Sequence, residues 1–366
     1  MNESQTQSRF AKIVNSNLQL RGSPNTVFRN TNKASKIQMP IISSFFVHHQ
    51  TLRSKSLKHS QLGKSDLNVS AMCLGTNNFG AQVQRDACFQ ILNTACDLGI
   101  NTIDTANTYT KGISEEIIGE WAVGRRSDVI IATKSGMEPP EDTRGNPMSK
   151  ANVLFQIESS LKRLKTDYID LYYVHQFDPQ TPLEETLGTL NVLVREGKIR
   201  HVACSNFSAG QVSSALDICA KEGYESFIAN QIRYNILQRE AESETIPFCS
   251  SKSIGIIAYS PLRAGLLAGR YEKGAPPPPG SRASFRGPEY MKRIVTDENL
   301  QRLEKLKAIA SESKVSLPVL AVSWILKHEA IQSVAVGASS PEQLRETSLA
   351  AEVKLSTETF DRINSV

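Results

Sequence analysis

Residues 168–175 read Tyr-Ile-Asp-Leu-Tyr-Tyr-Val-His, an apolar stretch that ends on a residue with reactive chemistry. Its apolar part, Tyr168–Val174, has the length and the β-branched and aromatic content of a buried strand. Seven similar runs flank it in the chain, at Ala71–Leu74, Thr102–Asp104, Val129–Thr133, Ile199–Ala203, Phe227–Ile232, Ile254–Tyr259 and Ile331–Val336. The sequence therefore predicts eight short buried strands.

The segments between these runs have helical periodicity. In Gln84–Leu98, apolar residues recur at positions that fall on one helix face. Glycine follows several predicted helices just before the next strand, at Gly99, Gly197 and Gly223. Eight strand–helix units in about 270 residues predict an α/β fold of the (β/α)8 TIM-barrel type. A doubly wound sheet is the rival, but the chain has no GxGxxG after the first strand and no GxxxxGK.

The chain divides by composition into a head, residues 1–57, and a barrel, residues 58–366. Residues 1–60 hold nine Lys or Arg and a single acid, Glu3, so this part alone has a charge of +8, whereas the whole chain has a net charge of +5. This composition predicts a disordered extension or a transit peptide, and hence an organelle, plastid or mitochondrion; an untargeted chain would be cytoplasmic. A strand-like pair at Gln61–Ser70 is expected to form a β-hairpin that caps the bottom of the barrel.

Charge and cysteine content exclude several classes of function. The remaining 306 residues carry a net charge of −3, which gives no argument for nucleic-acid binding. No apolar run approaches 18 residues, so no membrane span is predicted. The six cysteines form no CxxC pair and no His pair has zinc spacing, so we expect reduced cysteines and no metal site.

Four reactive side chains fall at the predicted C-terminal strand ends, where barrels carry their active sites. Asp104 ends the second strand and Tyr109 follows it, Lys134 ends the third, and His175 ends the fourth. A buried lysine needs a counter-ion, which Asp104 supplies, and its charge favours the phenolate form of Tyr109. A tyrosine made more acidic can act as a general acid, and a neutral His175 can orient a carbonyl oxygen. The set suits reduction of a carbonyl group by hydride.

Residues 62–366 resemble an aldo-keto reductase. The strings that carry the resemblance are Leu-Gly-Thr-Asn-Asn-Phe-Gly at 74–80, Asp-Thr-Ala-Asn-Thr-Tyr at 104–109, Ser-Glu-Glu-Ile-Ile-Gly at 114–119, Ala-Thr-Lys at 132–134, Asp-Leu-Tyr-Tyr-Val-His at 170–175, Ser-Asn-Phe-Ser at 205–208, Ala-Tyr-Ser-Pro-Leu at 258–262 and Gly-Ala-Ser-Ser-Pro-Glu-Gln-Leu at 337–344. Eight such strings in the family's order are specific. The resemblance is strongest to the branch of potassium-channel beta subunits and bacterial sugar and aryl-alcohol reductases.

By this resemblance, Tyr109 is the catalytic acid, Lys134 and Asp104 tune it, and His175 orients the carbonyl. The resemblance also implies an NADPH/NADP+ site. Ser205, Asn206 and Gln231 would hold the carboxamide and Tyr259 would stack on the nicotinamide. The remaining implied contacts are a pyrophosphate loop of Ser260, Leu262, Gly265 and Leu267, and an adenosine site of Ser339, Gln343 and Glu346.

The sequence departs from the family pattern at several places. Thr110 replaces the usual Gly after the acid tyrosine, which restricts the backbone if that position needs a positive φ. Thr347 replaces the usual Asn near the adenine, and Arg345 is the only nearby cation for a 2′-phosphate. Asn77 and Asn78 stand where many members have Trp or Met, which alters the expected substrate pocket.

The long segment Arg263–Val295 contains four consecutive prolines and is expected to be an extended flap over the cofactor rather than a plain surface loop. On that interpretation Arg282, Phe285 and Arg286 face the substrate or a phosphate.

Three functions stay open. The first is an NADPH-dependent reductase of aldehydes or ketones, with a small carbonyl compound as its partner. The second is a redox-sensing regulatory subunit that binds NADPH with little turnover. The third is a barrel isomerase or lyase with a phosphate site at Gly337–Ser340. The sequence names neither the carbonyl substrate nor the oligomeric state.

Overall fold

The computed structural model describes residues 57–137 and 144–366. The predicted extension or transit peptide, residues 1–57, lies outside these described residues except for Leu57. Its disorder, its targeting role and the domain boundary at residue 58 stay predictions.

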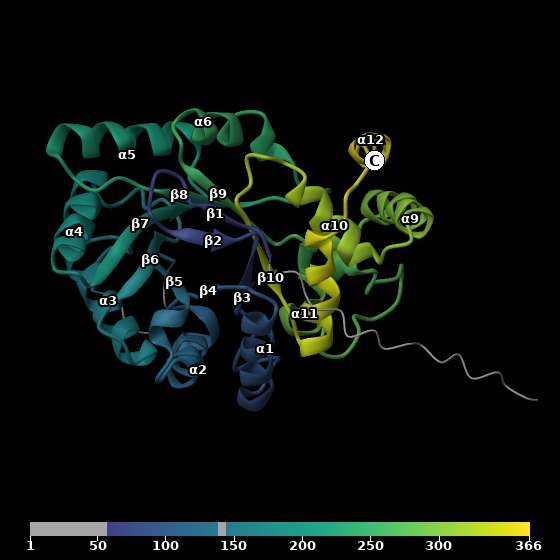
Figure 1. The fold of residues 1–366 in the computed structure, drawn as a ribbon, viewed down its shortest axis with the longest axis horizontal. Helices are drawn as coiled ribbons and strands as arrows, with labels where there is room; N and C mark the ends of the chain where they lie inside the picture. Colours follow the sequence, from purple (N-terminus) through teal and green to yellow (C-terminus); the bar gives the residue numbers. More distant parts are fainter. Residues whose placement is uncertain (1–56, 138–143) are drawn as a thin grey trace, which may run out of the picture. The chain divides into compact units, whose positions relative to one another are not determined.

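Eight parallel strands close into a barrel in the order β10-β3-β4-β5-β6-β7-β8-β9 (Figure 1). The barrel closes where β10 pairs with β3, with Val336 opposite Leu74. Its strands are β3 (Met72–Gly75), β4 (Thr102–Asp104), β5 (Ile130–Ser135), β6 (Ile169–Val174), β7 (Ile199–Ser205), β8 (Ala229–Arg233), β9 (Gly255–Tyr259) and β10 (Ser333–Gly337). Each lies on or within two residues of a predicted run. The (β/α)8 barrel is confirmed, and the open doubly wound sheet is excluded.

Helices connect the strands around the outside of the barrel (Figure 1). They are α1 (Arg85–Asp97), α2 (Ile113–Trp121), α3 (Lys150–Leu164), α4 (Leu183–Arg195), α5 (Ala209–Glu222), α6 (Thr245–Ser251), α7 (Arg282–Arg286), α8 (Pro288–Ile294), α9 (Asp297–Glu312), α10 (Leu317–Leu326), α11 (Pro341–Ser348) and α12 (Thr357–Asn364). Gly99, Gly197 and Gly223 all have positive φ, so they end helices in the left-handed conformation as predicted.

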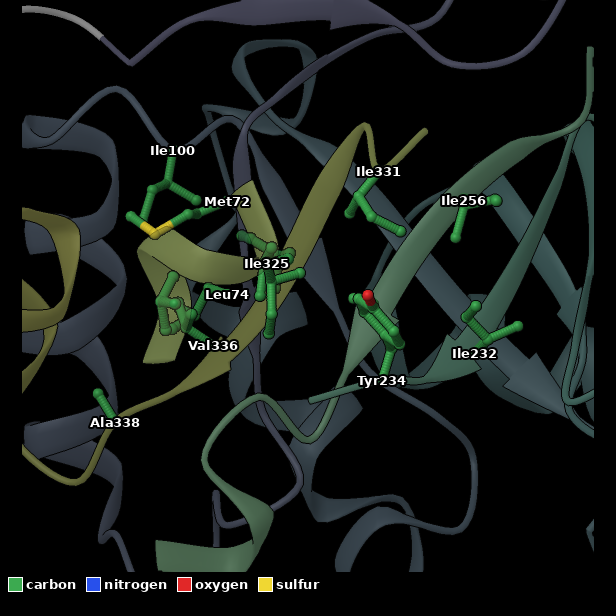
Figure 2. Close-up of a cluster of buried hydrophobic side chains, with 14 of the residues drawn as sticks. Met72, Leu74, Ile100, Ile232, Tyr234, Ile256, Ile325, Ile331, Val336 and Ala338 are labelled. Atoms are coloured by element: carbon green, nitrogen blue, oxygen red, sulfur yellow. The ribbon is translucent and has the colours of Figure 1, made fainter. Parts of the chain in front are cut away.

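Two apolar layers hold the barrel together. The inner layer fills the barrel with the small side chains of Cys73, Ala132, Ala203, Ala229 and Ala335 together with larger ones such as Leu171 and Tyr173. The outer layer lies between strands and helices, and Figure 2 shows part of it, with side chains from β3, β8, β9 and β10 beside the helical Ile325. Alternate residues of each strand face these two layers, which fixes which strand-end residues point to the barrel axis.

An N-terminal hairpin closes the bottom of the barrel. Its strands β1 (His59–Gln61) and β2 (Asn68–Ser70) pair antiparallel, which confirms the predicted cap. Leu62 and Val69 from this hairpin are fully buried in the inner apolar layer. The bottom of the barrel is therefore filled, and the chemistry is confined to the opposite end.

The segment after β9 is more ordered than the extended run we expected. It contains a 3-10 turn at Arg263–Ala268 and the short helices α7 and α8. The buried Tyr271 ties these parts together, because its hydroxyl donates to the carbonyl of Ala264 at 2.7 Å and accepts from the amide of Ala283 at 3.4 Å. Through Tyr271, the part of this segment at α7 is thus hydrogen-bonded to the turn that directly follows β9.

The described residues contain no single helix long and apolar enough to cross a membrane; α9 and α10 pass that test only as a pair bent by 89°. All six cysteines are free, as expected, and Cys96 is the exposed one.

Candidate active site

The structure brings the four predicted reactive side chains to the C-terminal rim of the barrel. Asp104 and Lys134 lie on the neighbouring strands β4 and β5, Tyr109 begins the 3-10 turn after β4, and His175 directly follows β6. Asp104, Lys134 and His175 are buried, and Tyr109 is half-buried. These residues are separated by up to 71 positions in the chain, and the closure of the barrel brings them together.

Lys134 makes hydrogen bonds to two other members of the cluster, Asp104 and Tyr109. Its Nζ donates to Oδ1 of Asp104 at 2.6 Å, to the carbonyl of Thr105 at 2.8 Å and to the Tyr109 phenol oxygen at 3.4 Å. Burial alone would lower the pKa of the ammonium, but the carboxylate of Asp104 and the phenol of Tyr109 outweigh it, and the pKa is raised. Lys134 therefore stays charged although its side chain is fully buried.

Tyr109 differs from the expectation in one respect. Burial raises the pKa of its phenol, and although Lys134 lowers it as predicted, the net pKa lies above the ordinary value. The desolvation of the phenolate exceeds the attraction of the lysine. Tyr109 is thus a protonated donor at neutral pH, with a cation in place for the phenolate formed when the proton leaves.

His175 is held neutral. Burial, followed by the positive charge of Lys134, lowers the pKa of its imidazole to about 3. The ring meets the Tyr109 ring edge to face, with centroids 6.1 Å apart and an angle of 77° between the planes. Its buried Nδ1 has no hydrogen-bond partner among the described residues. A neutral imidazole beside the phenol can donate one hydrogen bond to a carbonyl oxygen.

The residues that the resemblance assigns to the carboxamide form one connected network. Gln231 donates its amide Nε2 to Oδ2 of Asp104 at 2.7 Å, and Ser205 donates to the carbonyl of Gln231 at 2.9 Å. Asn206 donates to Ser205 at 3.1 Å and accepts from the Tyr259 hydroxyl at 2.7 Å. In this structure Gln231 therefore supports the Asp104–Lys134 pair directly, a role that the sequence did not indicate.

The predicted pyrophosphate loop has a strained backbone. Ser260, Arg263 and Ala264 have positive φ values of 61°, 41° and 57°, and Gly265 has 96°. Two amides of this turn donate within it, that of Arg263 to the Ser260 carbonyl at 3.0 Å and that of Gly265 to the Leu262 carbonyl at 2.9 Å. Leu262 and Leu267 close the turn, because the Leu267 amide donates to the Leu262 carbonyl at 3.1 Å.

The predicted adenosine contacts lie together at the start of α11. The Ser339 amide donates to Oε1 of Gln343 at 2.9 Å, and Ser340 caps the helix by accepting from the Gln343 amide at 3.3 Å. Glu346 lies on the same helix and is exposed. Arg345, the one cation near this site in the sequence, donates to Thr94 of α1 at 3.4 Å.

A different cation reaches the rim of the barrel from the flap. Arg282 at the start of α7 is half-buried, and its positive charge weakly opposes the rise in the pKa of Tyr109 that burial causes. Arg286, four residues on, is exposed, as is Phe285, with 57% of its side chain accessible. Of the two arginines considered in the sequence, Arg282 is thus the one with an electrostatic link to the catalytic cluster.

Similarity to known proteins shows the family of the chain. The model of the Aldo/keto reductase family matches residues 71–366. The chain belongs to the aldo/keto reductase family. It is 34% identical to the uncharacterized oxidoreductase YrpG of Bacillus subtilis (strain 168) over 324 residues, 85% of this chain and 96% of that protein. It is 33% identical to a probable voltage-gated potassium channel subunit beta of Oryza sativa subsp. japonica over 322 residues, with the same coverage of both chains.

Aldo/keto reductases are generally NAD(P)H-dependent oxidoreductases, so this chain is an oxidoreductase by family. The family's usual Gly after the tyrosine is Thr110 here, with φ +49°, and its hydroxyl compensates by donating to the Phe79 carbonyl at 2.8 Å. The side-chain amide of Asn78 donates a hydrogen bond to the carbonyl of Ala338 at 2.8 Å. Thr347, which replaces the usual Asn, is buried.

Sequence reasoning missed an ion pair next to the cluster, between the buried Glu115 and the half-buried Arg163. Arg163 Nε donates to the fully buried Glu115 carboxylate at 2.7 Å, and Thr133 donates to its other oxygen at 2.5 Å. The same arginine packs against Gly112, where an added Cβ would lie 2.7 Å from its Cδ. This pair anchors the turn that carries Tyr109 to the strand that carries Lys134. The acid at 115 inside an otherwise apolar helix face was the available signal.

Proposed function

We propose that the protein is an NADPH-dependent reductase that converts aldehydes or ketones to alcohols. The observation that carries this proposal is the buried Asp104–Lys134 pair hydrogen-bonded to a protonated Tyr109 beside a neutral His175. A cluster with one proton donor and one fixed cation suits a reaction in which an oxygen gains negative charge and then a proton.

The residues present fit a nicotinamide dinucleotide. Tyr259 has a half-exposed ring held by Asn206 at the mouth of the barrel, suited to stacking on a planar ring. The turn after Tyr259 contains Gly265, whose lack of a side chain suits the close approach of a pyrophosphate, and the start of α11 with Ser339 and Gln343 suits the adenosine end. When bound, the reduced nicotinamide supplies the hydride.

The side chains of the site then act on the oxygen atom of the substrate carbonyl group. His175 donates a hydrogen bond that orients the substrate carbonyl, and Tyr109 gives its proton to the oxygen as the C–O double bond is lost. Lys134, 3.4 Å from the phenol oxygen, stabilises the phenolate that remains. Asp104, fixed by Gln231, keeps the lysine charged and directed at the phenol. The flap fastened by Tyr271 would exclude water from the cofactor side.

Preference for NADPH over NADH is part of the proposal. The polar start of α11, with Ser339 and Gln343, supplies donors for a 2′-phosphate, although the Arg345 guanidinium donates to Thr94 instead. The test is a fluorescence titration of the full chain with NADPH and with NADH, followed by a screen for aldehyde-dependent oxidation of NADPH. Tight NADPH binding with turnover is the expected result, and binding of neither dinucleotide would refute the proposal.

One observation favours a second function. The relative from Oryza sativa subsp. japonica carries the name of a probable potassium channel subunit beta, so a regulatory subunit that senses the redox state of bound NADPH is the alternative. In that case NADPH binds tightly but aldehydes oxidise it only slowly. The rate of multiple turnover in the aldehyde screen separates the two functions.

We also propose that residues 1–57 direct the chain to a plastid or mitochondrion. The support is their composition, rich in Ser, Arg and Lys and poor in acids. Fusion of residues 1–57 to a fluorescent protein should place it in an organelle, and a diffuse cytoplasmic signal would contradict the proposal.

A further inference from the structure

A guanidinium group stands at the mouth of the barrel beside the proposed stacking tyrosine. Arg233 is the last residue of β8, two positions after Gln231, so both side chains belong to the face directed at the barrel axis. Arg233 is the register partner of Tyr259 on β9, and its Cζ lies 5.6 Å from the centroid of the Tyr259 ring. Its side chain is exposed. Arg233 therefore lies one layer nearer the mouth of the barrel than Gln231, the residue that donates to Asp104.

A second guanidinium group approaches from the next strand end. Arg263 begins the 3-10 turn after β9, and its Nε is buried without a hydrogen-bond partner. Burial, and next the positive charge of Arg233, lower the pKa of Arg263. Glu240 acts in the opposite direction but more weakly than Arg233. Because Arg233 is the register partner of Tyr259 and Arg263 begins the turn after that strand, the two arginines lie at neighbouring strand ends.

The neighbouring arginines Arg239 and Arg302 donate their side-chain hydrogen bonds to other groups of the protein. Arg239 makes two hydrogen bonds to the carboxylate of Glu242, at 2.8 and 2.9 Å. Arg302 donates to the carbonyls of Val366 and Ile236. Within residues 57–137 and 144–366, neither Arg233 nor Arg263 has an ion pair or a side-chain hydrogen bond. Two unpaired guanidinium groups at one rim supply planar donors that match a carboxylate or phosphoryl group.

We propose that Arg233 and Arg263 form a subsite for an anionic group of the substrate, so that the preferred substrate is an aldehyde or ketone that carries a carboxylate or phosphoryl group. This inference rests on the proposed reductase function. The dinucleotide phosphates are the other source of such a group, because the backbone of Arg263 belongs to the turn proposed for the pyrophosphate. Arg233 lies beside Tyr259, the residue proposed to stack on the nicotinamide, at the same end of the barrel as Tyr109.

The test compares substrates that differ in charge at nearly constant shape. Wild-type protein and Arg233→Gln are assayed with 4-carboxybenzaldehyde and with its uncharged near-isostere 4-nitrobenzaldehyde, and succinic semialdehyde serves as a flexible anionic probe. Arg195→Gln is the matched control, because Arg195 is an exposed arginine in the last turn of α4, at the opposite end of the barrel. The Kd for NADPH is measured for each variant by fluorescence.

We expect Arg233→Gln to raise KM for the anionic aldehydes at least about ten-fold and to leave KM for the uncharged aldehyde and the Kd for NADPH within about two-fold. Arg233→Glu should reverse the preference toward 4-(trimethylammonio)benzaldehyde. Equal changes for charged and uncharged aldehydes would overturn the subsite. Weaker NADPH binding with unchanged aldehyde KM would assign the arginines to the dinucleotide and overturn it as well.

A binding measurement separates failure of the subsite from failure of the reductase function. If no aldehyde is reduced, the reductase proposal fails, and calorimetric binding of 4-(hydroxymethyl)benzoate in the presence of NADP+ still tests the subsite. Binding that weakens at least ten-fold in Arg233→Gln, but not in Arg195→Gln, supports it. Equal binding by all three proteins contradicts it.

Discussion

The ammonium of Lys134 and the carboxylate of Asp104 lie 2.6 Å apart, and both side chains are buried at the rim of the barrel. Lys134 is fully enclosed, so the pair exists because each charge compensates the other in a poorly solvated site. The rest of the proposed chemistry depends on this pair, because it keeps a cation fixed beside Tyr109.

Removal of one charge of the pair should be more damaging than removal of both. We expect Lys134→Met to lower the free energy of unfolding by about 3–5 kcal/mol, because it leaves the Asp104 carboxylate buried without its partner. The double variant Lys134→Met/Asp104→Leu should lose less than Lys134→Met. Urea unfolding at pH 7 measures both. A double variant less stable than the single one would show that the pair is not electrostatically coupled.

The neutral state of His175 should make stability depend on pH. Its pKa is about 3 in the folded protein against an ordinary 6.5, so the unfolded chain binds a proton between these values that the folded chain does not. The free energy of unfolding therefore decreases as pH falls below about 6.5, by up to about 1.4 kcal/mol per pH unit. His175→Gln should show a shallower decline between pH 6.5 and 4. Parallel stability curves for the two proteins would contradict the assignment.

The strain at Thr110 gives a prediction on the backbone. Its φ of +49° is unfavourable for any residue with a Cβ, and its hydroxyl offsets part of the cost through Phe79. Thr110→Ala loses that hydrogen bond but keeps the strain, whereas Thr110→Gly loses both. We therefore expect Thr110→Gly to be about 1 kcal/mol more stable than Thr110→Ala in urea unfolding. The reverse order would indicate a different conformation at this turn.

Arg282 should matter for the cofactor and Arg286 should not. Arg282 is half-buried and acts on Tyr109, whereas Arg286 is exposed at the end of the same short helix. We expect Arg282→Gln to raise the Kd for NADPH about ten-fold or more, through loss of a hydrogen bond to a charged group. Arg286→Gln, the matched control, should stay near the wild-type value in the same fluorescence titration. Unchanged binding in both variants would remove Arg282 from the site.

The sequence predicted the fold well because strand and helix patterns are local. The runs around Thr102–Asp104 and Tyr168–Val174 match β4 and β6 to within one residue, since each is a short apolar segment bounded by turns. The pairing of Lys134 with Asp104 was also predictable, because a lysine directed at the barrel interior needs an acid and neighbouring strands supply it.

Other features depend on distances that spacing along the chain does not encode. Gln231 is 127 residues from Asp104, and only closure of the barrel shows that it supports the carboxylate. The pKa of Tyr109 was predicted with the wrong net direction because the sequence reveals the nearby charge but not the depth of burial. Arg233 was detectable in principle, since it follows Gln231 at the two-residue period of a strand and therefore faces the same axis.

The most direct test of the central claim is the rate of NADPH oxidation by an aldehyde in single-turnover mixing of the wild-type protein and Tyr109→Phe. The phenol is the proposed proton donor, so its removal should slow the chemical step about 10²–10⁴-fold while the Kd for NADPH stays unchanged. A Tyr109→Phe protein that reduces the aldehyde at the wild-type rate would contradict the account.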